Sequence, residues 1–234
     1  MYYKLVVYGY FILIIISCFL FYRFITTKSK QFDIPTRNLF RDNIKTGDIL
    51  LLDWQKTNNI FLASFFRTSF MHPGIAIWEN GDLYIVELIN YFNDNKYRGL
   101  IKIPFNKWYR INKRSIILHN PLLIKNESSG DREILRDKII SFYRKYSPKI
   151  KRPSGFGLDW TRFLFPPHKY QEITEFNKIL CTEVIASLLA ETGVTKKTKS
   201  IQSFTPDSFI GMRDFDMKKP YNYGKHSLVR IKES

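Results

Sequence analysis

The longest uncharged run in the chain lies close to its N-terminus and covers residues 5–22. A run of this length is sufficient for a helix that crosses a bilayer. Aromatic residues of the kind found at membrane interfaces flank and interrupt the run: Tyr2, Tyr3, Tyr8, Tyr10 and Tyr22. We therefore expect a transmembrane anchor over residues 1–23, a polar linker over residues 24–44 and one folded domain over residues 45–234.

Two other interpretations of the N-terminal segment stay open. A cleaved signal peptide is one, although no small-x-small cleavage site follows the run. A lipoprotein signal is the other, because residues 15–18 resemble a lipobox, although Phe-Leu-Phe-Tyr after Cys18 is an unusual mature start.

For a single-pass anchor, the flanking charges predict the orientation. Lys4 precedes the run, and the basic residues that follow it are Arg23, Lys28, Lys30, Arg37 and Arg41. The positive-inside rule then places the domain on the cytoplasmic side, or on the interior side of a virion.

The chain carries a net charge of +16, with basic clusters at residues 144–145, 149–152 and 196–199. Beside a membrane anchor, anionic lipid headgroups are the simplest partner for these clusters, at about 1 kcal/mol for each Lys or Arg close to the surface. A merely solvated basic surface is the alternative. We do not expect a nucleic-acid partner, because the sequence contains no helix-turn-helix, zinc-ligand spacing or aromatic RNA-binding signature.

The composition narrows the class of protein further. With 44% apolar residues among 234, the chain can bury one sizeable core. It contains two cysteines, Cys18 and Cys181, so we expect no disulfide framework and no need for an oxidising compartment. No cluster of metal ligands stands out, and we expect neither a metal nor another cofactor. A high content of Ile, Lys, Phe and Asn is typical of a low-GC virus or bacterium.

Apolar runs separated by turn signals predict the elements of the domain. The expected strands cover residues 49–52, 74–78, 83–88, 100–104, 115–119 and 227–231. A hairpin turn with Asn80-Gly81 at its centre joins the second strand to the third, and the fourth and fifth are expected to pair. The expected helices cover residues 57–68, 131–146 and 176–191. Strands first and the key helix late indicate an α+β domain with an antiparallel sheet.

Cys181 is expected in about the first turn of its helix, within Leu180-Cys181-Thr182-Glu183-Val184. The free amides and the positive end of the helix dipole favour a thiolate there, and a thiolate is the form in which cysteine acts as a nucleophile. A buried structural cysteine is the alternative, because free cysteine packs like a small apolar residue.

His72 and Glu87 are candidates for the groups that activate such a thiol. His72 precedes a predicted strand, and Pro73-Gly74 follow it, which should keep the ring near the end of the sheet. Glu87 lies on the strand that returns from the hairpin turn, where its carboxylate could face the His72 strand and orient the imidazole. An outward-facing Glu87 is the alternative. The chain also contains His119, His168 and His226.

Together these motifs resemble the permuted papain-like branch of the NlpC superfamily, which includes YiiX-like proteins, poxvirus relatives and, more distantly, lecithin retinol acyltransferase. The order in that branch is a Gly-Asp strand, His-x-Gly-Ile, an acidic or polar residue on the next strand, and Cys-Ser/Thr-Glu on a helix. The matching positions lie within residues 45–212, at Gly47-Asp48, His72-Pro73-Gly74-Ile75, Glu87 and Cys181-Thr182-Glu183, with Gly157-Leu158-Asp159-Trp160 and Thr205-Pro206-Asp207 as weaker matches. Pro73 stands where Val is common, and Leu158 where Tyr is usual.

The resemblance implies a circularly permuted papain-like domain whose antiparallel sheet packs on the cysteine-bearing helix. It also implies a thiol hydrolase or acyltransferase that acts on an amide or ester bond through a thioester. Cys181 is then the nucleophile, His72 the proton acceptor and donor, and Glu87 the group that holds the ring, while Glu183 has a structural or capping role. The substrate is expected to be a lipid or a peptide. The alternative is a catalytically inactive papain-like domain that serves as a membrane-tethered binding module or a structural component of a virion.

Overall fold

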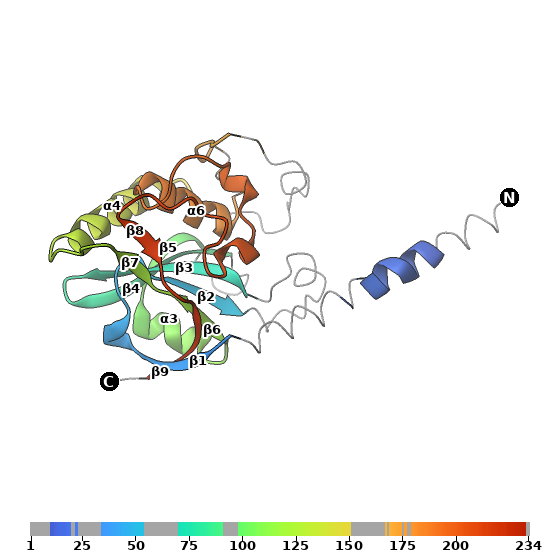
Figure 1. Ribbon diagram of the computed structural model, residues 1–234, viewed down its shortest axis with the longest axis horizontal. Coiled ribbons are helices and arrows are strands. Elements are labelled where there is room, and N and C mark those ends of the chain that lie inside the picture. The colour runs from blue at the N-terminus through green and yellow to red at the C-terminus, as the bar shows by residue number, and fades with distance from the viewer. Residues whose placement is uncertain are drawn as a thin grey trace.

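The computed structural model describes residues 10–19, 22, 34–53, 70–90, 98–150, 167, 169–174, 176 and 179–232 (Figure 1). The helix expected at residues 57–68, the motif at residues 157–160 and His168 lie outside the described residues. In the N-terminal run, residues 10–19 are helical. Among the helices that are described, none has the length and apolar character needed to cross a bilayer.

The described residues form one seven-stranded sheet in the order β1-β9-β6-β2-β3-β4-β5. Its strands are β1 (Thr36–Phe40), β2 (Ile49–Asp53), β3 (Phe70–Glu79), β4 (Asp82–Asn90), β5 (Arg98–Pro104), β6 (Ile117–Asn120) and β9 (Ser227–Lys232). A second, two-stranded sheet pairs β7 (Leu122–Ile124) with β8 (Tyr221–Tyr223). Neighbours in the large sheet are antiparallel except β1 and β9, which are parallel. The sheet is therefore mixed, and the expectation of a purely antiparallel sheet is wrong for this pair. Strand β1 also lies inside the range that was expected to be a linker.

The central hairpin is confirmed, whereas one predicted strand pair is wrong. Asn80 and Gly81 join β3 to β4 with φ angles of 53° and 82°, the left-handed conformation that a two-residue hairpin turn requires. Residues 100–104 do not pair with residues 115–119, because β5 pairs with β4 while β6 pairs with β2 and β9. The unpredicted helix α3 (Phe105–Asn112) separates β5 from β6 and allows the chain to reach the other side of β2.

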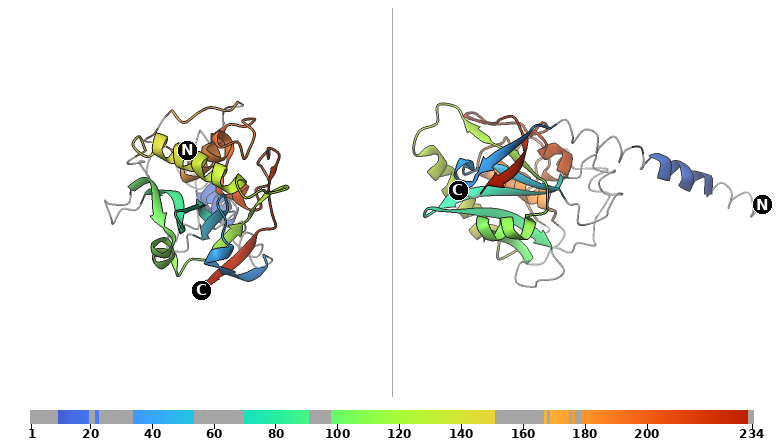
Figure 2. Two further views of the ribbon diagram at one scale, coloured as in Figure 1. Left: turned by 90° about the vertical axis from the view of Figure 1, so that its left-hand side faces the viewer. Right: turned by 90° about the horizontal axis from the view of Figure 1, so that it is seen from below.

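Helices cover both faces of the large sheet (Figures 1 and 2). Helix α4 (Asp131–Tyr146), whose bounds match the prediction, and helix α6 (Cys181–Glu191) contact β3 from one face, and α6 also contacts β4. Helix α3 contacts β4 and β5 from the other face. Three short 3-10 helices complete the described elements: η1 (Arg41–Asn43), η3 (Ile201–Ser203) and η4 (Pro206–Phe209).

The core is divided by the sheet into two apolar clusters. Along β2, Ile49 and Leu51 belong to the cluster under α4 and α6, whereas Leu50 and Leu52 belong to the cluster around α3. A strand buried on both faces needs apolar residues at every position, which explains the uninterrupted Ile-Leu-Leu-Leu sequence. The α+β class is confirmed, as is the packing of the sheet against the cysteine-bearing helix.

Candidate active site

His72 lies near the start of β3, at a bulge in the strand. Leu52 of β2 pairs with His72, whereas the next residue, Asp53, pairs with Phe70, so β3 contains one extra residue at this point. Bulges redirect a side chain and are frequent next to active sites. The His72 side chain is 12% exposed, and its Nε2 lies 3.0 Å from Oε2 of Glu87.

Glu87 is a buried carboxylate on the adjacent strand β4, directly opposite Gly74 of β3. His72 and Glu87 are therefore diagonal neighbours on one face of the sheet, within reach of two long side chains. A Cβ at Gly74 would lie 2.7 Å from Cγ2 of Ile85 and 3.7 Å from Oε2 of Glu87. The glycine of the His-x-Gly motif thus leaves room for the side chains of β4. The alternative of an outward-facing Glu87 is excluded, since only 1% of the residue is exposed.

Trp108 is a third member of this cluster, and the sequence reasoning missed it. It lies on α3 and is 1% exposed, and its indole Nε1 donates a hydrogen bond of 3.0 Å to Oε2 of Glu87. Phe105, one turn earlier, stacks on Trp108 with the ring centroids 5.8 Å apart. The local signal for this helix is the helical spacing of Phe105, Trp108 and Tyr109 within a short segment that also contains basic residues.

Cys181 is the first residue of α6, is half-buried and is not part of a disulfide. Leu180 is the N-cap residue of the helix, and its carbonyl accepts a 3.0 Å hydrogen bond from Val184 N. Glu183 is buried, and its Oε2 accepts a 3.1 Å hydrogen bond from the backbone N–H of Leu180. This contact is a capping interaction, so the structural role expected for Glu183 is confirmed. Cys181 lies where the amides of a first helical turn are free of helical partners.

The Cys181 thiol lies close enough to the His72 ring to raise its pKa. Since Nε2 is taken by Glu87, Nδ1 is the ring nitrogen that remains for the sulfur. Burial alone lowers the pKa of His72, but the interactions of the ring with Cys181 and Glu87 outweigh burial and raise the pKa to about 10. The ring is therefore protonated at neutral pH, and its positive charge lies beside the sulfur.

The structure thus brings together the three side chains that the sequence singled out, Cys181, His72 and Glu87. The other described histidines have different surroundings. His119 is fully buried and bonded to Asp48. Burial, followed by the nearby charges of Arg213 and Lys225, lowers the pKa of His226. Within the described ranges, no group of three or more His, Cys, Asp or Glu side chains could hold a metal ion.

No family model and no curated protein matches the chain. Among solved structures, the chain is similar to the crystal structure of the metalloprotein yiiX from Escherichia coli O157:H7. The similarity has a TM-score of 0.44 and 14% sequence identity, and it covers 65% of this chain and 70% of that chain.

Proposed function

We propose that the protein is a membrane-anchored cysteine hydrolase or acyltransferase that acts on an amide or ester bond. The observation that carries the proposal is that one imidazole, His72, lies beside a thiol at a helix start and is hydrogen-bonded to a buried carboxylate. Nucleophilic catalysis requires a nucleophile within hydrogen-bonding reach of a base. A third group, also within hydrogen-bonding reach, orients that base.

The first half of the reaction forms a thioester. With the proton on His72, the Cys181 thiolate attacks the carbonyl carbon of the substrate and forms a tetrahedral intermediate. The Cys181 backbone N–H, at the start of α6, is the proposed donor to the developing oxyanion. His72 then gives its proton to the leaving amine or alkoxide. The C–N or C–O bond breaks, and the acyl group stays on the sulfur.

The second half of the reaction returns the enzyme to its starting state. Water, or in a transferase an acceptor hydroxyl or amine, attacks the thioester carbonyl while His72 takes the proton of the attacking group. Collapse of this second intermediate breaks the C–S bond and releases the thiolate, again beside a protonated ring. Glu87 accepts the Nε2–H bond throughout, so the ring keeps Nδ1 directed toward the sulfur.

The permuted papain-like fold is part of the same proposal. It is supported by the order of the elements, since the strand with His72 precedes the helix with Cys181, and by the contacts of α6 with β3 and β4. Two residues of the matching motifs also support it. Gly74 of the His-x-Gly motif leaves room for the side chains of β4, and Glu87 of the acidic strand accepts a hydrogen bond from His72.

A membrane location and a lipid or peptide substrate complete the proposal. The helical residues 10–19 expose large apolar side chains, including Phe11 at 62% and Leu13 at 60%. The net charge of +16 suits a domain next to anionic lipid headgroups. We place the domain on the cytoplasmic side of a single-pass anchor, or on the interior side of a virion, because the basic residues follow the apolar run.

Thiol labelling tests the proposed chemistry. In the full chain in neutral detergent, an electrophilic probe such as iodoacetamide should alkylate Cys181 at pH 7 about tenfold faster than it alkylates free cysteine. Cys18→Ala is the matched control, because it removes the other thiol of the chain and should leave the labelling rate unchanged. Cys181→Ala should abolish the fast phase. Labelling of Cys181 no faster than free cysteine would contradict the proposal and favour an inactive papain-like binding module.

A further inference from the structure

The end of the sheet opposite His72 contains a cavity that the proposed chemistry does not use. Asp48 comes directly before β2, whereas His72 pairs with Leu52 near the other end of that strand. At a rise of about 3.3 Å per residue, the two positions lie roughly 13 Å apart along the strand. The cavity has a volume of about 320 Å³, at the lower end of the range for small-molecule sites.

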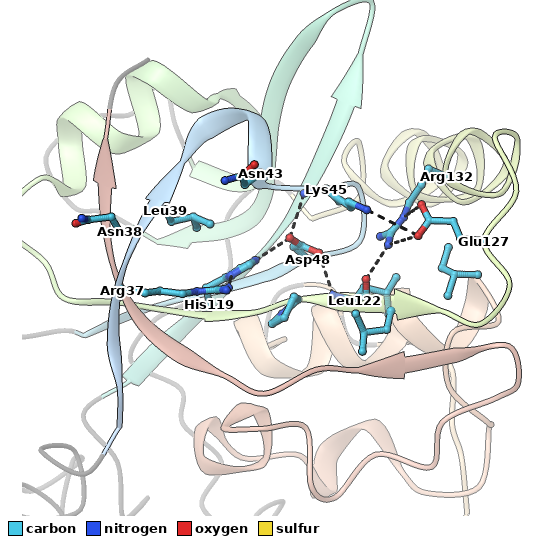
Figure 3. Close-up of a pocket in the computed structure, with 13 residues that line it drawn as sticks. Arg37, Asn38, Leu39, Asn43, Lys45, Asp48, His119, Leu122, Glu127 and Arg132 are labelled. Carbon is cyan, nitrogen blue, oxygen red and sulfur yellow. Dashed lines mark hydrogen bonds and ion pairs between the residues drawn. The ribbon is translucent and has the colours of Figure 1, made fainter.

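Two stretches that are distant in the sequence, residues 37–48 and 119–132, build the walls of this cavity. The first stretch contributes β1 and the turn before β2, and the second contributes the end of β6, β7, the turn after it and the first turn of α4 (Figure 3). Its charged lining residues are Arg37, Lys45 and Arg132, against Asp48 and Glu127. Three cations against two carboxylates leave the lining with one net positive charge.

Both carboxylates of the cavity are already occupied by protein donors. Asp48 is 1% exposed, and its Oδ2 accepts from Lys45 N at 3.0 Å and from His119 Nε2 at 2.7 Å, while its Oδ1 accepts from Leu122 N at 2.9 Å. Glu127 accepts two hydrogen bonds from Arg132, at 2.9 Å and 3.1 Å. Neither carboxylate is therefore free to bind a cationic ligand.

Arg132 bonds several protein acceptors, whereas Arg37 and Lys45 keep more of their donors for a ligand. Two further donors of Arg132 bond the carbonyl oxygens of Thr46 and Leu122. Lys45 Nζ is 3.9 Å from Glu127, too long for a hydrogen bond, and its side chain is 60% exposed. In the described part of the chain, no carboxylate lies within ion-pair distance of Arg37.

The bond from Arg37 goes to a neutral ring. Its Nη2 lies 2.7 Å from Nδ1 of His119, and a guanidinium can only donate, so Nδ1 is the acceptor. The ring proton is then on Nε2 and is donated to Asp48. His119 thus fixes the position of Arg37 without neutralising it, and Arg37 keeps donors for a ligand. Figure 3 shows Arg37 on one side of Asp48 and Lys45 on the other.

We propose that this cavity binds a phosphate group, as the free ion or as the head of a phosphomonoester, between Arg37 and Lys45. Phosphate matches the planar fork of an arginine and the point charge of a lysine, and charge-assisted hydrogen bonds of this kind are the strong ones. Asn38 and Asn43, which also line the cavity, carry amide donors suited to the remaining phosphate oxygens.

The test measures phosphate binding by the full chain in neutral detergent, with inorganic phosphate as the probe and chloride at equal ionic strength as the reference. The double variant Arg37→Gln/Lys45→Gln should bind phosphate at least about tenfold more weakly, since two charge-assisted contacts are lost. Arg110→Gln/Lys113→Gln is the matched control, because it removes two exposed charges at the C-terminal end of α3, away from the cavity, and should bind like the wild type.

Two further arms identify the source of the phosphate. Glycerol 3-phosphate represents a soluble ester, and nanodiscs with phosphatidate, against phosphatidylserine, represent a lipid headgroup. Competition by either one, dependent on Arg37 and Lys45, supports the proposal and names the source. The proposal is overturned if the two double variants bind alike, or if phosphate has no more effect than chloride on the unfolding temperature. If the first double variant fails to fold, Lys45→Gln alone carries the test.

Discussion

Trp108 and His72 bind the same oxygen atom, Oε2 of Glu87, each at 3.0 Å. The indole N–H can only donate, so it restricts where that oxygen can lie and thereby where the imidazole can lie. One carboxylate oxygen thus connects helix α3, on one face of the sheet, to the ring that contacts Cys181 of helix α6, on the other.

Trp108→Phe should weaken the proposed site more than its loss of stability explains. Removing the donor to a buried carboxylate is expected to lower the free energy of unfolding by about 2 kcal/mol. Because the Glu87 oxygen is then less restrained, we expect the alkylation rate of Cys181 to fall several-fold. The measurements are urea unfolding and iodoacetamide labelling in the Cys18→Ala background.

Trp78→Phe is the matched control for Trp108→Phe. Its Nε1 donates a 2.6 Å hydrogen bond to the carbonyl oxygen of Ile44, remote from the thiol. This variant should lose stability but keep the labelling rate. Equal labelling rates in the two tryptophan variants would show that Trp108 has a packing role only.

Glu87→Gln should lower the pKa of His72, because it removes a hydrogen bond and a negative charge that raise it toward about 10. NMR of the ring protons measures this directly, and His72→Gln identifies the resonance among the four histidines. A His72 pKa that is the same in both proteins would contradict the assigned hydrogen bond.

The same shift predicts how stability depends on pH. The folded-state pKa of His72 lies above its ordinary value of 6.5, so folding favours the protonated ring. The stabilisation is therefore complete below about pH 6.5 and is lost as the pH rises toward about 10. Urea unfolding of the wild type and of Glu87→Gln should differ most at the acidic end of this window and converge at its alkaline end.

Gly74→Ala should destabilise the hairpin that holds Glu87. A Cβ at this position would come within 2.7 Å of Ile85, and overpacking of this kind typically costs about 1–3 kcal/mol. Gly130→Ala is the control, because a Cβ there meets no atom within 4 Å. Calorimetric unfolding of both variants measures the difference in stability. A Gly74→Ala protein as stable as the control would show that the glycine of the His-x-Gly motif is not needed for steric reasons.

The N-terminal anchor can be tested by charge. Ile14→Lys/Ile16→Lys places two charges in the apolar run, at about 3 kcal/mol each near a bilayer centre, and should release the protein from membranes on carbonate extraction. Ile116→Lys/Ile134→Lys adds the same charges at exposed apolar positions of the domain and should leave the protein membrane-bound. Release of both variants, or of neither, would argue against the anchor.

The sequence patterns correctly predicted those elements that depend on interactions between residues close together in the chain. The Asn80-Gly81 turn, the bounds of α4 and the end of α6 at Glu191 follow from turn chemistry and from apolar spacing, whereas α6 begins at Cys181 and not at residue 176 as predicted. The positions of His72 and Glu87 follow from the same hairpin, because its register places them two residues apart along one face.

The elements and contacts that were not predicted depend on residues that are far apart in the sequence or lack a clear local signal. Helix α3 has eight residues and begins after Pro104 without a side-chain cap, so no capping residue in the sequence marks its start. Because the helix was not predicted, the role of Trp108 was not predicted either. The parallel pairing of β1 with β9 joins opposite ends of the described domain. The partnership of Asp48 with His119, 71 positions later, is equally distant.

The position of β9 between β1 and β6 has a consequence for biosynthesis. β1 is the first strand of the sheet to leave the ribosome, yet its neighbour in the sheet, residues 227–232, comes after every other described strand. Until those residues emerge, Arg37 has no strand to align it with His119, and one wall of the phosphate cavity is missing. An N-terminal anchor could therefore engage a membrane during translation, whereas the domain that follows it can close only afterwards.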